Sequence, residues 1–530
     1  GQLGIGTTTF SRTPSAQAVN FGLGRTAKRV YAGRDFSCAI LDNNTAKCWG
    51  AGSSGELGQG FSDLLAPPTD PINYGIDTNG QALWPKSLST NESNVCALLN
   101  NNSVKCSGWN LYYQLGDGSS LYESLPGGYF GTVAKNMTEP LNFGLGEIPV
   151  QVAVGGQHAC VLLARGQTKC WGEGFYNIGY ENRNRYQSPL DATINLGTNT
   201  SVLKVSAGFH TCAILTDSTL KCWGYNNYGQ LGQGASGNLG DSTGEMAALA
   251  EISLDGSAVS ITVGSSHVCA VLESGSLKCW GRNADGQLGL GDALDRGDGA
   301  GEMGSALPEV SVSGAAFPRT VLAAAAGNGH TCALLNTHIV KCWGRGTNGQ
   351  LGYENNTTLG DGSSEMGAAL NSVSLGSGRT AIQLAVGSNH TCALLDDSTS
   401  KCWGLNNQGQ TARATTAGNV ANTMGDNLSA IDVTDSNLPT ATWSTGSAIF
   451  QTASYTLDFD EPISGIDDSD FSTTGTATGC VVDAGAISTT QYSVQADCTS
   501  DGTVAITLET GGFQDYAGNS IAADETSATT

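Results

Sequence analysis

Short hydrophobic runs separated by polar turns recur along most of the chain. In one example, residues 332–335 are Cys-Ala-Leu-Leu, residues 336–338 are Asn-Thr-His, and residues 339–342 are Ile-Val-Lys-Cys. Two short runs on either side of a polar turn are typical of a β-hairpin. If the turn is centred midway between the two cysteines, they face each other on neighbouring strands at a separation that suits a disulfide. The pattern therefore predicts a disulfide-stapled hairpin.

This cysteine spacing occurs seven times, with nine residues between partners, and an eighth, wider pair follows. Zinc is the competing interpretation, but it needs closely spaced cysteine hooks that converge on one ion, and the sequence contains none. A Cys-x-x-Cys redox motif is also absent. We therefore predict eight disulfides and an oxidising compartment, extracellular or at the cell surface, with the periplasm as the third such compartment. The predicted pairs are Cys38 with Cys48, Cys96 with Cys106, Cys160 with Cys170, Cys212 with Cys222, Cys269 with Cys279, Cys332 with Cys342, Cys392 with Cys402, and Cys480 with Cys498.

The hairpin belongs to a unit that repeats every 52 to 64 residues. Each unit combines a Gly-Gln-Leu-Gly loop, a strand, a Gly-x-x-His-x-Cys-Ala segment and Lys-Cys-Trp-Gly, although Phe36 and Asn94 replace His in the first two units. A period of this length indicates a propeller or an array, and its short strands indicate an all-β fold. Over about residues 1–435 the sequence resembles the regulator of chromosome condensation repeat family in a bacterial secreted form. The resemblance implies a seven-bladed β-propeller.

The strand that follows each Gly-Gln-Leu-Gly loop occurs eight times, although seven hairpins need only seven. The first copy contains residues 18–21, and the last lies within residues 410–433. Only one of them can close the ring. The other is a loop or packs outside the ring, since connecting segments tolerate such variation. Alternatively it pairs with a neighbouring chain, because an unpaired strand edge templates self-association.

A different pattern begins near residue 436. Short strand-like runs bounded by Gly, Asp and Ser turns, such as residues 455–459 and 504–508, suggest a β-sandwich. Residues 459–465 (Phe-Asp-Glu-Pro-Ile-Ser-Gly) and 515–519 (Asp-Tyr-Ala-Gly-Asn) resemble segments of bacterial Ig-like domains. We therefore expect an all-β protein with a seven-bladed β-propeller at residues 1–435 and a C-terminal Ig-like β-sandwich at residues 436–530.

Charge and composition narrow the range of partners. The chain has 24 Lys and Arg against 47 Asp and Glu, a formal net charge of -23, and no run of basic residues. A phosphate backbone would be repelled, so we expect no nucleic-acid partner. No apolar stretch approaches the roughly 18 residues that span a bilayer, so we expect no membrane insertion in this segment. The sequence begins without Met or a signal peptide, and we expect it to be a piece of a longer protein.

The histidines and tryptophans that repeat with the unit are interpreted as structural. Each unit supplies one such His, which does not make a metal site, and we expect the imidazoles to bridge backbone groups of adjacent strands. The Trp that follows the second cysteine is expected to pack inside each blade. The histidines are His158, His210, His267, His330 and His390, and the tryptophans are Trp49, Trp171, Trp223, Trp280, Trp343 and Trp403.

Candidate ligand-binding residues lie where units two and three break the repeat. These units are rich in Tyr and Trp with Arg nearby, the residue types that dominate binding hot spots. The alternative is that several of these rings fill the blades, because each ring buries a large area. Protein and glycan ligands would use the same side chains. The predicted ligand-binding set is Trp109, Tyr112, Tyr113, Tyr176, Tyr180 and Arg183.

One acidic loop is a candidate calcium site, formed by Asp292, Asp295, Asp298 and Glu302. Hard cations bind several carboxylate and carbonyl oxygens, and a loop supplies both. The spacing does not match an EF-hand, and a solvated acidic loop is the alternative. Calcium is the one cofactor that the sequence leaves open.

Enzyme signatures are absent: the sequence has no Gly-x-Ser-x-Gly, no His-Glu-x-x-His and no phosphate-binding loop. We therefore expect no catalytic residues and a secreted or cell-surface, adhesin-like module that binds protein or glycan at the propeller loops. One alternative is a subunit of an extracellular fibre, linked by strand or Ig-domain contacts. Another is a polysaccharide-active propeller enzyme, because propellers host such chemistry. Nucleotide exchange on a small GTPase, which is known in the resembled family, is disfavoured because the disulfides place the chain outside the cytoplasm.

Overall fold

The chain divides into two compact units. The propeller unit contains Gly1–Asn20 and Ala27–Asp432, and the C-terminal unit contains Phe21–Thr26 and Val433–Thr530. The structure, a computed structural model, describes residues 25–58, 71–77, 79–117, 140–173, 178–182, 184–186, 188–189, 193–198, 200–313, 319–407, 424, 441–443, 447–449, 452–459, 463–464, 471–478, 480–486, 491–498, 504–508, 514–515 and 525–526.

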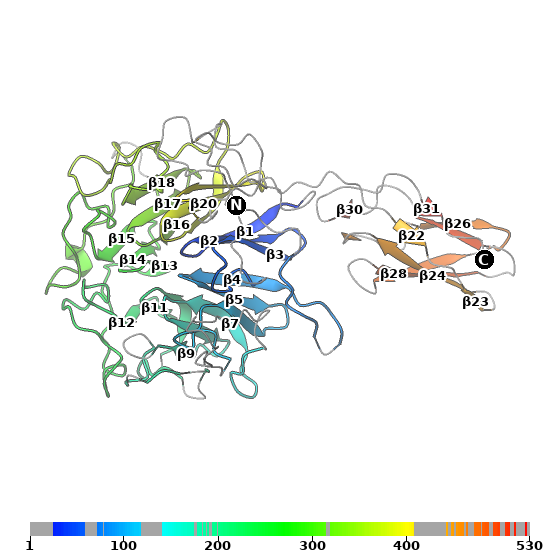
Figure 1. Cartoon of the computed structure of the whole chain (residues 1–530), viewed down its shortest axis with the longest axis horizontal. Coiled ribbons are helices and arrows are strands. Elements are labelled where there is room, and N and C mark those ends of the chain that lie inside the picture. Colours follow the sequence, from blue (N-terminus) through cyan, green and yellow to red (C-terminus); the bar gives the residue numbers. More distant parts are fainter. Residues whose placement is uncertain are drawn as a thin grey trace, which may run out of the picture. The chain divides into compact units, whose positions relative to one another are not determined.

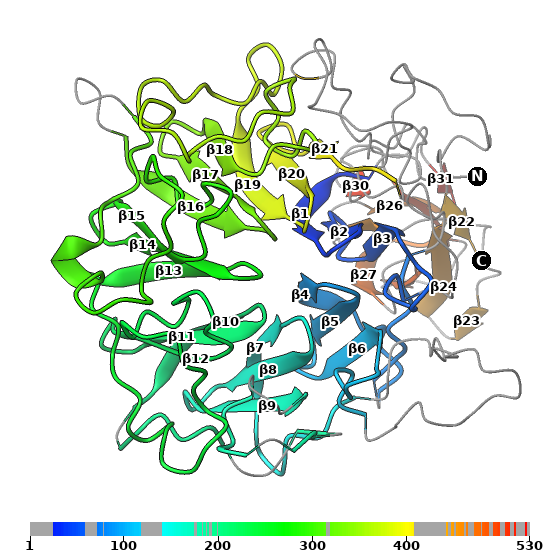
Figure 2. The same cartoon turned by 60° about the vertical axis from the view of Figure 1, so that its left-hand side comes forward.

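Seven three-stranded antiparallel sheets stand around a common axis in the propeller unit (Figure 1, Figure 2). Each sheet, or blade, takes its strands in sequence order, and the first strand is the one next to the axis. This confirms the prediction of an all-β repeat with seven blades. Blades 1 to 4 are β1 (Ala27–Ala32), β2 (Phe36–Leu41), β3 (Ala46–Gly50); β4 (Pro85–Asn91), β5 (Asn94–Leu99), β6 (Val104–Gly108); β7 (Pro149–Val154), β8 (His158–Leu163), β9 (Thr168–Gly172); and β10 (Val202–Ala207), β11 (His210–Leu215), β12 (Leu220–Gly224). Blades 5 to 7 are β13 (Ala258–Val263), β14 (His267–Leu272), β15 (Leu277–Gly281); β16 (Val321–Ala326), β17 (His330–Leu335), β18 (Val340–Gly344); and β19 (Ala381–Val386), β20 (His390–Leu395), β21 (Ser400–Gly404). A short 3-10 helix, η1 (Gly304–Ala306), lies in the loop that follows blade 5.

The second and third strands of each blade form the predicted hairpin. Cys332 lies directly opposite Cys342 in the register of β17 and β18, and the corresponding cysteines pair in the same way in the other blades. The second strand is buried along its whole length in every blade. Each hairpin therefore holds its cysteines in the interior, face to face.

All eight predicted disulfides are formed, with Cα–Cα separations of 3.9 to 4.1 Å, and no cysteine is free. The predicted pairing is therefore confirmed at every position. The bonds of the seven blades join Cys38 to Cys48, Cys96 to Cys106, Cys160 to Cys170, Cys212 to Cys222, Cys269 to Cys279, Cys332 to Cys342, and Cys392 to Cys402. The eighth bond joins Cys480 to Cys498 in the C-terminal unit.

The hydrophobic core lies between the blades. Six clusters of buried side chains each draw from two neighbouring blades of the described structure. Leu334 and Val340 of blade 6, for example, share a cluster with Leu395 and Trp403 of blade 7. All six repeated tryptophans are 1% exposed or less, which confirms their predicted packing role. A single blade therefore cannot bury its faces alone and depends on both neighbours.

Blade 7 meets blade 1 through the same contacts that join other neighbours. Gln383 Nε2 donates to the Val30 carbonyl at 2.9 Å, and the Val30 N–H donates to Gln383 Oε1 at 3.2 Å. Gln151 makes the same two bonds to Val205 between blades 3 and 4, at 2.7 and 3.1 Å. The seven blades thus form a closed ring. The two extra-strand copies, in residues 18–21 and 410–433, lie outside the described residues apart from Met424.

The first strands of the seven blades enclose a central cavity of about 380 Å³. Backbone and small or neutral side chains line it, including Ser89, Thr262 and Asn328. In the described part of the chain, Tyr31 is the only titratable residue on its wall. The cavity therefore offers no acid–base pair or metal ligand set.

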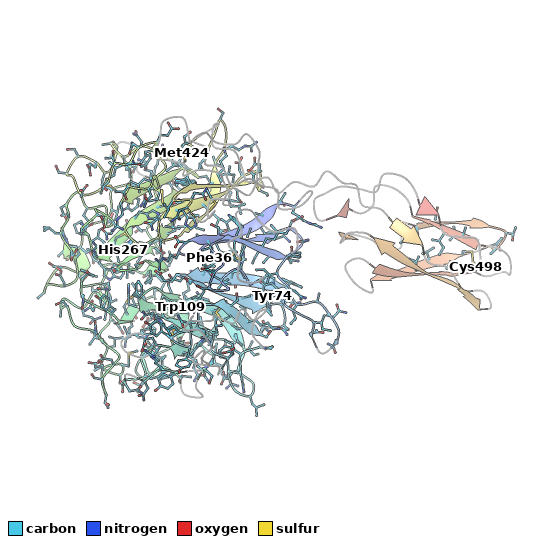
Figure 3. The ribbon with its side chains drawn as sticks, viewed as in Figure 1. Phe36, Tyr74, Trp109, His267, Met424 and Cys498 are labelled. Atoms are coloured by element: carbon cyan, nitrogen blue, oxygen red, sulfur yellow. A yellow bond between two sulfur atoms is a disulfide. The ribbon has the colours of Figure 1, made fainter. Side chains whose placement is uncertain are left out.

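The C-terminal unit consists of antiparallel strands. One sheet has the order β22-β24-β28-β27 with β23 beside β24, a second has the order β26-β29-β31, and β25 pairs with β30. Cys480 and Cys498 join the ends of β27 and β28 (Figure 3). No helix in the described segments of either unit has the length and apolar character needed to span a bilayer. The strands are β22 (Ala441–Trp443), β23 (Ser447–Ile449), β24 (Thr452–Phe459), β25 (Ile463–Ser464), β26 (Phe471–Gly475), β27 (Val481–Ala486), β28 (Gln491–Asp497), β29 (Val504–Leu508), β30 (Gln514–Asp515) and β31 (Glu525–Thr526).

Candidate functional site

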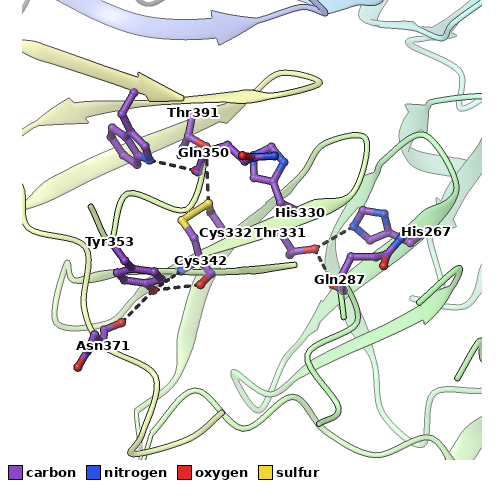
Figure 4. The surroundings of a disulfide bond; sticks show 11 residues. His267, Gln287, His330, Thr331, Cys332, Cys342, Gln350, Tyr353, Asn371 and Thr391 are labelled. Atoms are coloured by element: carbon purple, nitrogen blue, oxygen red, sulfur yellow. Dashed lines mark hydrogen bonds between the residues drawn. A yellow bond between two sulfur atoms is a disulfide. The ribbon is translucent and has the colours of Figure 1, made fainter. Parts of the chain in front are cut away.

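Four of the five repeated histidines bond to hydroxyl groups of the next blade, and not to backbone groups as the sequence led us to expect. His267 Nε2 of blade 5 shares a 2.8 Å hydrogen bond with Thr331 Oγ1 of blade 6 (Figure 4). His330 in turn bonds to Thr391 of blade 7 at 3.1 Å. The same contact joins blade 3 to blade 4 (His158–Thr211, 2.6 Å) and blade 7 to blade 1 (His390–Ser37, 2.9 Å).

The hydroxyl groups define the tautomer of these imidazoles. Thr331 Oγ1 donates its proton to the Gln287 carbonyl at 2.8 Å, so the hydrogen bond with His267 requires an Nε2–H donor on the imidazole. Nδ1 of the same ring has no partner. Since protonation would add a buried N–H without an acceptor, burial holds the pKa of His267 at about 4, and that of His330 at about 3. These rings are therefore neutral inter-blade links that do not serve as acid–base catalysts near neutral pH.

Three interfaces depart from this pattern in different ways. In blades 2 and 3 the matching positions are Asn94 and Ala159. In blades 1 and 2 the matching positions are Phe36 and Val95, two buried residues of one hydrophobic cluster. In blade 4, His210 is fully buried and faces a blade whose matching residue is Val268, and neither ring nitrogen of His210 has a hydrogen-bond partner. Burial, followed by the neighbouring His267 and His158, lowers the pKa of His210 to about 3.

The Gly-Gln-Leu-Gly loop also serves the inter-blade contact. The Gln287 carbonyl accepts the indole N–H of Trp343 at 3.0 Å, and its side-chain Oε1 accepts the Asp285 N–H at 2.9 Å. Leu288 is fully buried. Gly289 has a φ of +68°, and a Cβ there would lie 2.6 Å from the indole nitrogen of Trp343, so only glycine fits. The motif residues that repeat are therefore structural, and a ligand site must lie in the positions that vary.

One such site lies in the loops that follow β6 and β9. The rings of Trp109 and Tyr112 meet edge to face at 5.3 Å, and the guanidinium of Arg185 lies over the Tyr112 ring at 5.1 Å. Arg185 Nε also pairs with Glu173 Oε2 at 2.8 Å. The cation–π contact thus joins a loop of blade 2 to a loop of blade 3, and the ion pair holds Arg185 within the blade 3 loop. All these residues except Glu173 remain partly exposed.

The same loop positions carry a second linked group in blades 4 to 6. The guanidinium of Arg282 lies 5.6 Å from the centre of the Tyr228 ring, and Arg282 also lies 3.7 Å from Asp285. Asp285 forms a 2.7 Å ion pair with Arg345 of the next blade. We call Trp109, Tyr112, Glu173, Arg185, Tyr228, Arg282, Asp285 and Arg345 the loop band. It presents half-buried Trp, Tyr and Arg side chains in fixed positions, which suits recognition of another macromolecule.

The structure gathers only part of the predicted ligand-binding set. It brings Trp109 and Tyr112 together, and Tyr113 follows them with a positive φ of 64°. Tyr180 packs inside blade 3, 4.9 Å from Tyr186, where its hydroxyl accepts the Cys170 N–H and burial raises its pKa to about 12. Tyr176 and Arg183 lie outside the described residues.

Of the loop band, the predicted set contains only Trp109 and Tyr112; Arg185 lies two positions from the predicted Arg183, and five further members were missed. Three of them come one position after a Trp-Gly pair, and the other two come four positions after one. An alignment of the seven units would have shown that these two positions change from unit to unit, whereas the Trp-Gly pair before them and the Gly-Gln-Leu-Gly motif after them recur in most units. The missed residues are Glu173, Tyr228, Arg282, Asp285 and Arg345.

Three of the four acidic residues of the predicted calcium site bond to donors of their own loop. Asp292 Oδ2 pairs with Arg296 at 2.6 Å, and Asp295 Oδ1 accepts the Asn283 N–H at 2.6 Å. Glu302 Oε2 accepts the N–H groups of Gly297 and Gly299, both at 2.9 Å. Asp298 lies beside Glu302, and desolvation followed by the Glu302 carboxylate raises the pKa of Asp298. Within the described residues, which include all four, no three His, Cys, Asp or Glu side chains are arranged to hold a metal ion.

A small pocket of about 190 Å³ lies beside blades 1 and 2 on the loop side. Arg34 bridges two carboxylates there, at 3.3 Å from Asp35 Oδ2 and 3.4 Å from Glu92 Oε2. Desolvation raises the pKa of both carboxyl groups, and the Arg34 charge opposes that rise. The shared guanidinium makes this an ion-pair cluster between blades.

Comparison with known proteins identifies the repeat. The family described as "Regulator of chromosome condensation (RCC1) repeat" matches residues 27–56, 150–178, 202–230, 258–287, 321–350 and 381–410, and a second description of the same repeat matches residues 274–334. The propeller carries RCC1 repeats. This confirms the resemblance to the repeat family.

Relatives of the RCC1 propeller include plant proteins. The chain is 29% identical over 359 residues to the ultraviolet-B receptor UVR8 of Arabidopsis thaliana, an alignment that covers 66% of this chain and 72% of that protein. It is 27% identical over 315 residues to the mitochondrial RCC1 domain-containing protein RUG3 of the same plant, which covers 57% of this chain and 66% of that protein.

Solved structures share the fold. Prp20p of Saccharomyces cerevisiae superposes with a TM-score of 0.55 at 16% identity, covering 90% of this chain and 94% of that one. Human WBSCR16 gives a TM-score of 0.55 at 19% identity, covering 71% and 87%. At these identities the likeness shows the fold alone.

Proposed function

We propose that this chain is an extracellular or cell-surface, non-catalytic binding module, adhesin-like, that recognises a protein ligand through the loop band of its RCC1 propeller. The contact of Trp109, Tyr112 and Arg185 across two blades carries the proposal. In this proposal residues 436–530 form an Ig-like β-sandwich that serves as a stalk, and the propeller domain ends at residue 435.

The loop band has the properties of a preorganised binding surface. Trp, Tyr and Arg contribute most to binding hot spots, and side chains that are already held lose little rotamer freedom when a ligand binds. Arg185 is held by Tyr112 and Glu173, and Arg345 is held by Asp285. The Arg185 side chain is 38% exposed and the Arg345 side chain is 26% exposed, so their guanidinium groups keep N–H donors for a ligand.

Related propellers support a protein ligand over a glycan. One solved structure of the same fold is that of Kap60 bound to yeast RCC1 (Prp20), and Prp20p is also described as binding Gsp1p and histones. These partners belong to those proteins. They support the general mode, in which an RCC1 propeller binds another protein.

The disulfides support the compartment. Eight disulfides and no free cysteine favour an oxidising environment, since cytosolic reductants keep thiols reduced.

Ligand selection with a matched pair of variants tests the proposal. The full chain is immobilised and probed with a display library of extracellular proteins and, in parallel, with a glycan array. Replacing Trp109→Ala with Tyr112→Ala should weaken the selected protein ligands at least about tenfold, whereas Trp84→Ala, an exposed Trp outside the loop band, should leave them unchanged. Protein ligands that bind the double variant as well as the wild type would overturn the proposal. If glycans but no proteins were selected, and the double variant lost them, a glycan ligand would be favoured. Cleavage of an arrayed polysaccharide would favour a polysaccharide-active enzyme.

A further inference from the structure

Every blade has a β-bulge at the same point of its first strand. The pairing register between the first and second strands shifts at the second residue of the first strand. No residue of the second strand lies directly opposite this one. We call these seven residues the bulge ring. They are Lys28, Lys86, Val150, Leu203, Val259, Leu322 and Ile382.

The bulge ring surrounds one mouth of the central cavity. In each first strand, the next residue or the one after it lines the cavity, as with Val205 after Leu203. Neighbouring bulges are linked directly: Lys204 Nζ donates to the Val259 carbonyl at 2.6 Å, and Arg29 donates to the Lys86 carbonyl at 2.9 Å. The seven positions therefore follow one another around the axis at the end opposite to the loop band.

Five consecutive blades place an aliphatic side chain in this ring. These side chains, in blades 3 to 7, are between 42% and 52% exposed. Ile148, which precedes β7, is 48% exposed, and Trp84, which precedes β4, is 36% exposed. Single exposed apolar residues need no explanation, but an exposed arc repeated in five neighbouring blades marks an interaction surface.

The other two members of the ring, Lys28 and Lys86, are cationic, and Arg29 and Lys204 lie next to ring positions. Lys86, Arg29 and Lys204 are exposed, and each donates to a neutral carbonyl or amide oxygen. Among the nearby hairpin-turn carboxylates, Asp396 and Asp397 pair with Arg379, and Asp217 accepts two hydrogen bonds from Thr219 of its own turn. The surface therefore suits an occupant that combines apolar groups with excess negative charge.

The C-terminal unit of this protein has that chemistry. Residues 433–530 contain eleven Asp and three Glu but no Lys, Arg or His, so this stretch carries a charge of -14 out of the -23 of the whole chain. An exposed apolar residue, Val481 at 69%, opens β27 of the same unit.

We propose that the bulge ring binds the acidic C-terminal unit of a second copy of this chain. The two surfaces differ, so the contact is head to tail, and each copy keeps one free ring and one free C-terminal unit for the next. Opposite charge steers the encounter, and the aliphatic arc supplies the buried apolar surface. This inference is independent of the proposed ligand site, because the loop band stays uncovered.

Sedimentation of the full chain tests the proposal. Wild-type protein should form larger species as its concentration rises to about 100 µM at about 20 mM salt, and fewer of them at about 300 mM salt, because salt screens the charges. Replacing Leu203→Glu with Leu322→Glu should weaken association at least about tenfold, since like charges would meet across the contact. Leu294→Glu is the matched control: Leu294 is 65% exposed in a loop outside the ring, and its replacement should change nothing. Thermal melts of all variants confirm folding.

A mixing experiment tests the head-to-tail geometry. A tail variant with Asp467→Asn, Asp468→Asn and Asp470→Asn keeps an intact ring, and the ring variant keeps an intact tail. Each alone should sediment as a monomer, whereas their mixture should stop at pairs. Lys86→Glu with Lys204→Glu gives a second ring variant by charge reversal and should behave as the first.

Other outcomes overturn the inference. Monomeric wild type at every concentration and salt would do so, as would association that survives both ring variants. Concentration-independent compaction that the tail variant abolishes would place the acidic unit on the ring of its own chain and would also overturn it. Failure of this proposal leaves ligand binding at the loop band unaffected.

Discussion

The interface between blades 6 and 7 and the interface between blades 1 and 2 use the same backbone positions with opposite chemistry. Blades 6 and 7 share a buried hydrogen bond between His330 and Thr391, whereas blades 1 and 2 bury Phe36 and Val95 there. In the first, the imidazole Nε2 has a hydrogen-bond partner although Nδ1 has none, and in the second no polar group is present. The comparison shows that the two positions act as a pair. The blade 4–5 interface, with His210 against Val268, mixes the two solutions and leaves the imidazole unsatisfied.

Acid should destabilise the folded chain through the buried histidines of the polar interfaces. The folded-state pKa of His158, His210, His330 and His390 is about 3 and that of His267 about 4, whereas an unfolded His titrates near 6.5. Above about pH 6.5 these histidines are unprotonated in both the folded and the unfolded chain, so the free energy of unfolding has its full value. As the pH falls below about 6.5, only the unfolded chain takes up protons at these histidines. Each His should then lower the free energy of unfolding by about 1.4 kcal/mol per pH unit, and all five together by up to about 7 kcal/mol per pH unit. Urea unfolding between about pH 7.5 and 5.5 measures the slope.

A control converts one polar interface to the apolar solution. His267→Phe with Thr331→Val reproduces the pair found between blades 1 and 2 and should reduce the pH slope by about a fifth, since one of five titrating rings is removed. An unchanged slope would contradict the assignment of the slope to these rings.

The tryptophan of the blade interface should be far more costly to lose than the tryptophan of the loop band. Trp343→Ala removes a buried ring and leaves the Gln287 carbonyl without its indole donor, for an expected loss of about 3 to 5 kcal/mol. Trp109→Ala, at a partly exposed position, should cost less than about 1 kcal/mol. Chemical denaturation of both variants measures the difference. Equal losses would mean that the loop band is part of the structural core.

Removing one hairpin disulfide should have a smaller effect. Replacing Cys332→Ala with Cys342→Ala releases a short closed loop, and loop entropy gives a loss of about 2 to 3 kcal/mol. The same change at Cys480 and Cys498 should leave the propeller transition in place, because that pair joins strands of the other compact unit. Calorimetry that follows the propeller transition separates the two cases.

Completing the mixed interface should give a small gain. Val268→Thr places a hydroxyl at the position that matches Thr331, within reach of His210, and is expected to stabilise the chain by about 0.5 to 1.5 kcal/mol. His210→Phe tests the same pair from the other side: it should be neutral or stabilising in the wild-type background and destabilising when combined with Val268→Thr. A double-mutant cycle by urea denaturation measures the coupling, and additive effects would show that the two positions are independent.

Local patterns were sufficient for the hairpins and their disulfides. The cysteines lie ten positions apart, and only a hairpin with its turn at the midpoint brings them opposite each other, so sequence spacing carries the answer. The repeated Trp was equally readable, because a position kept in six blades reports packing. The acidic loop shows the opposite case. Asp292 and Glu302 lie close in sequence, but Arg296 and backbone N–H groups hold them in the folded loop.

The sequence by itself determined the strands, the seven-fold repeat and the disulfide pairs, because each depends on residues within one blade. The tertiary structure decided which side chains meet across blades: the hydroxyl partner of each His, the stacking of Arg185 on Tyr112, and the arc formed by Leu203, Val259 and Leu322. These residues lie roughly 50 to 70 positions apart or in loops of variable length, and no local spacing encodes their distance. Closure of the ring brings them together, since each blade buries its faces only against its neighbours.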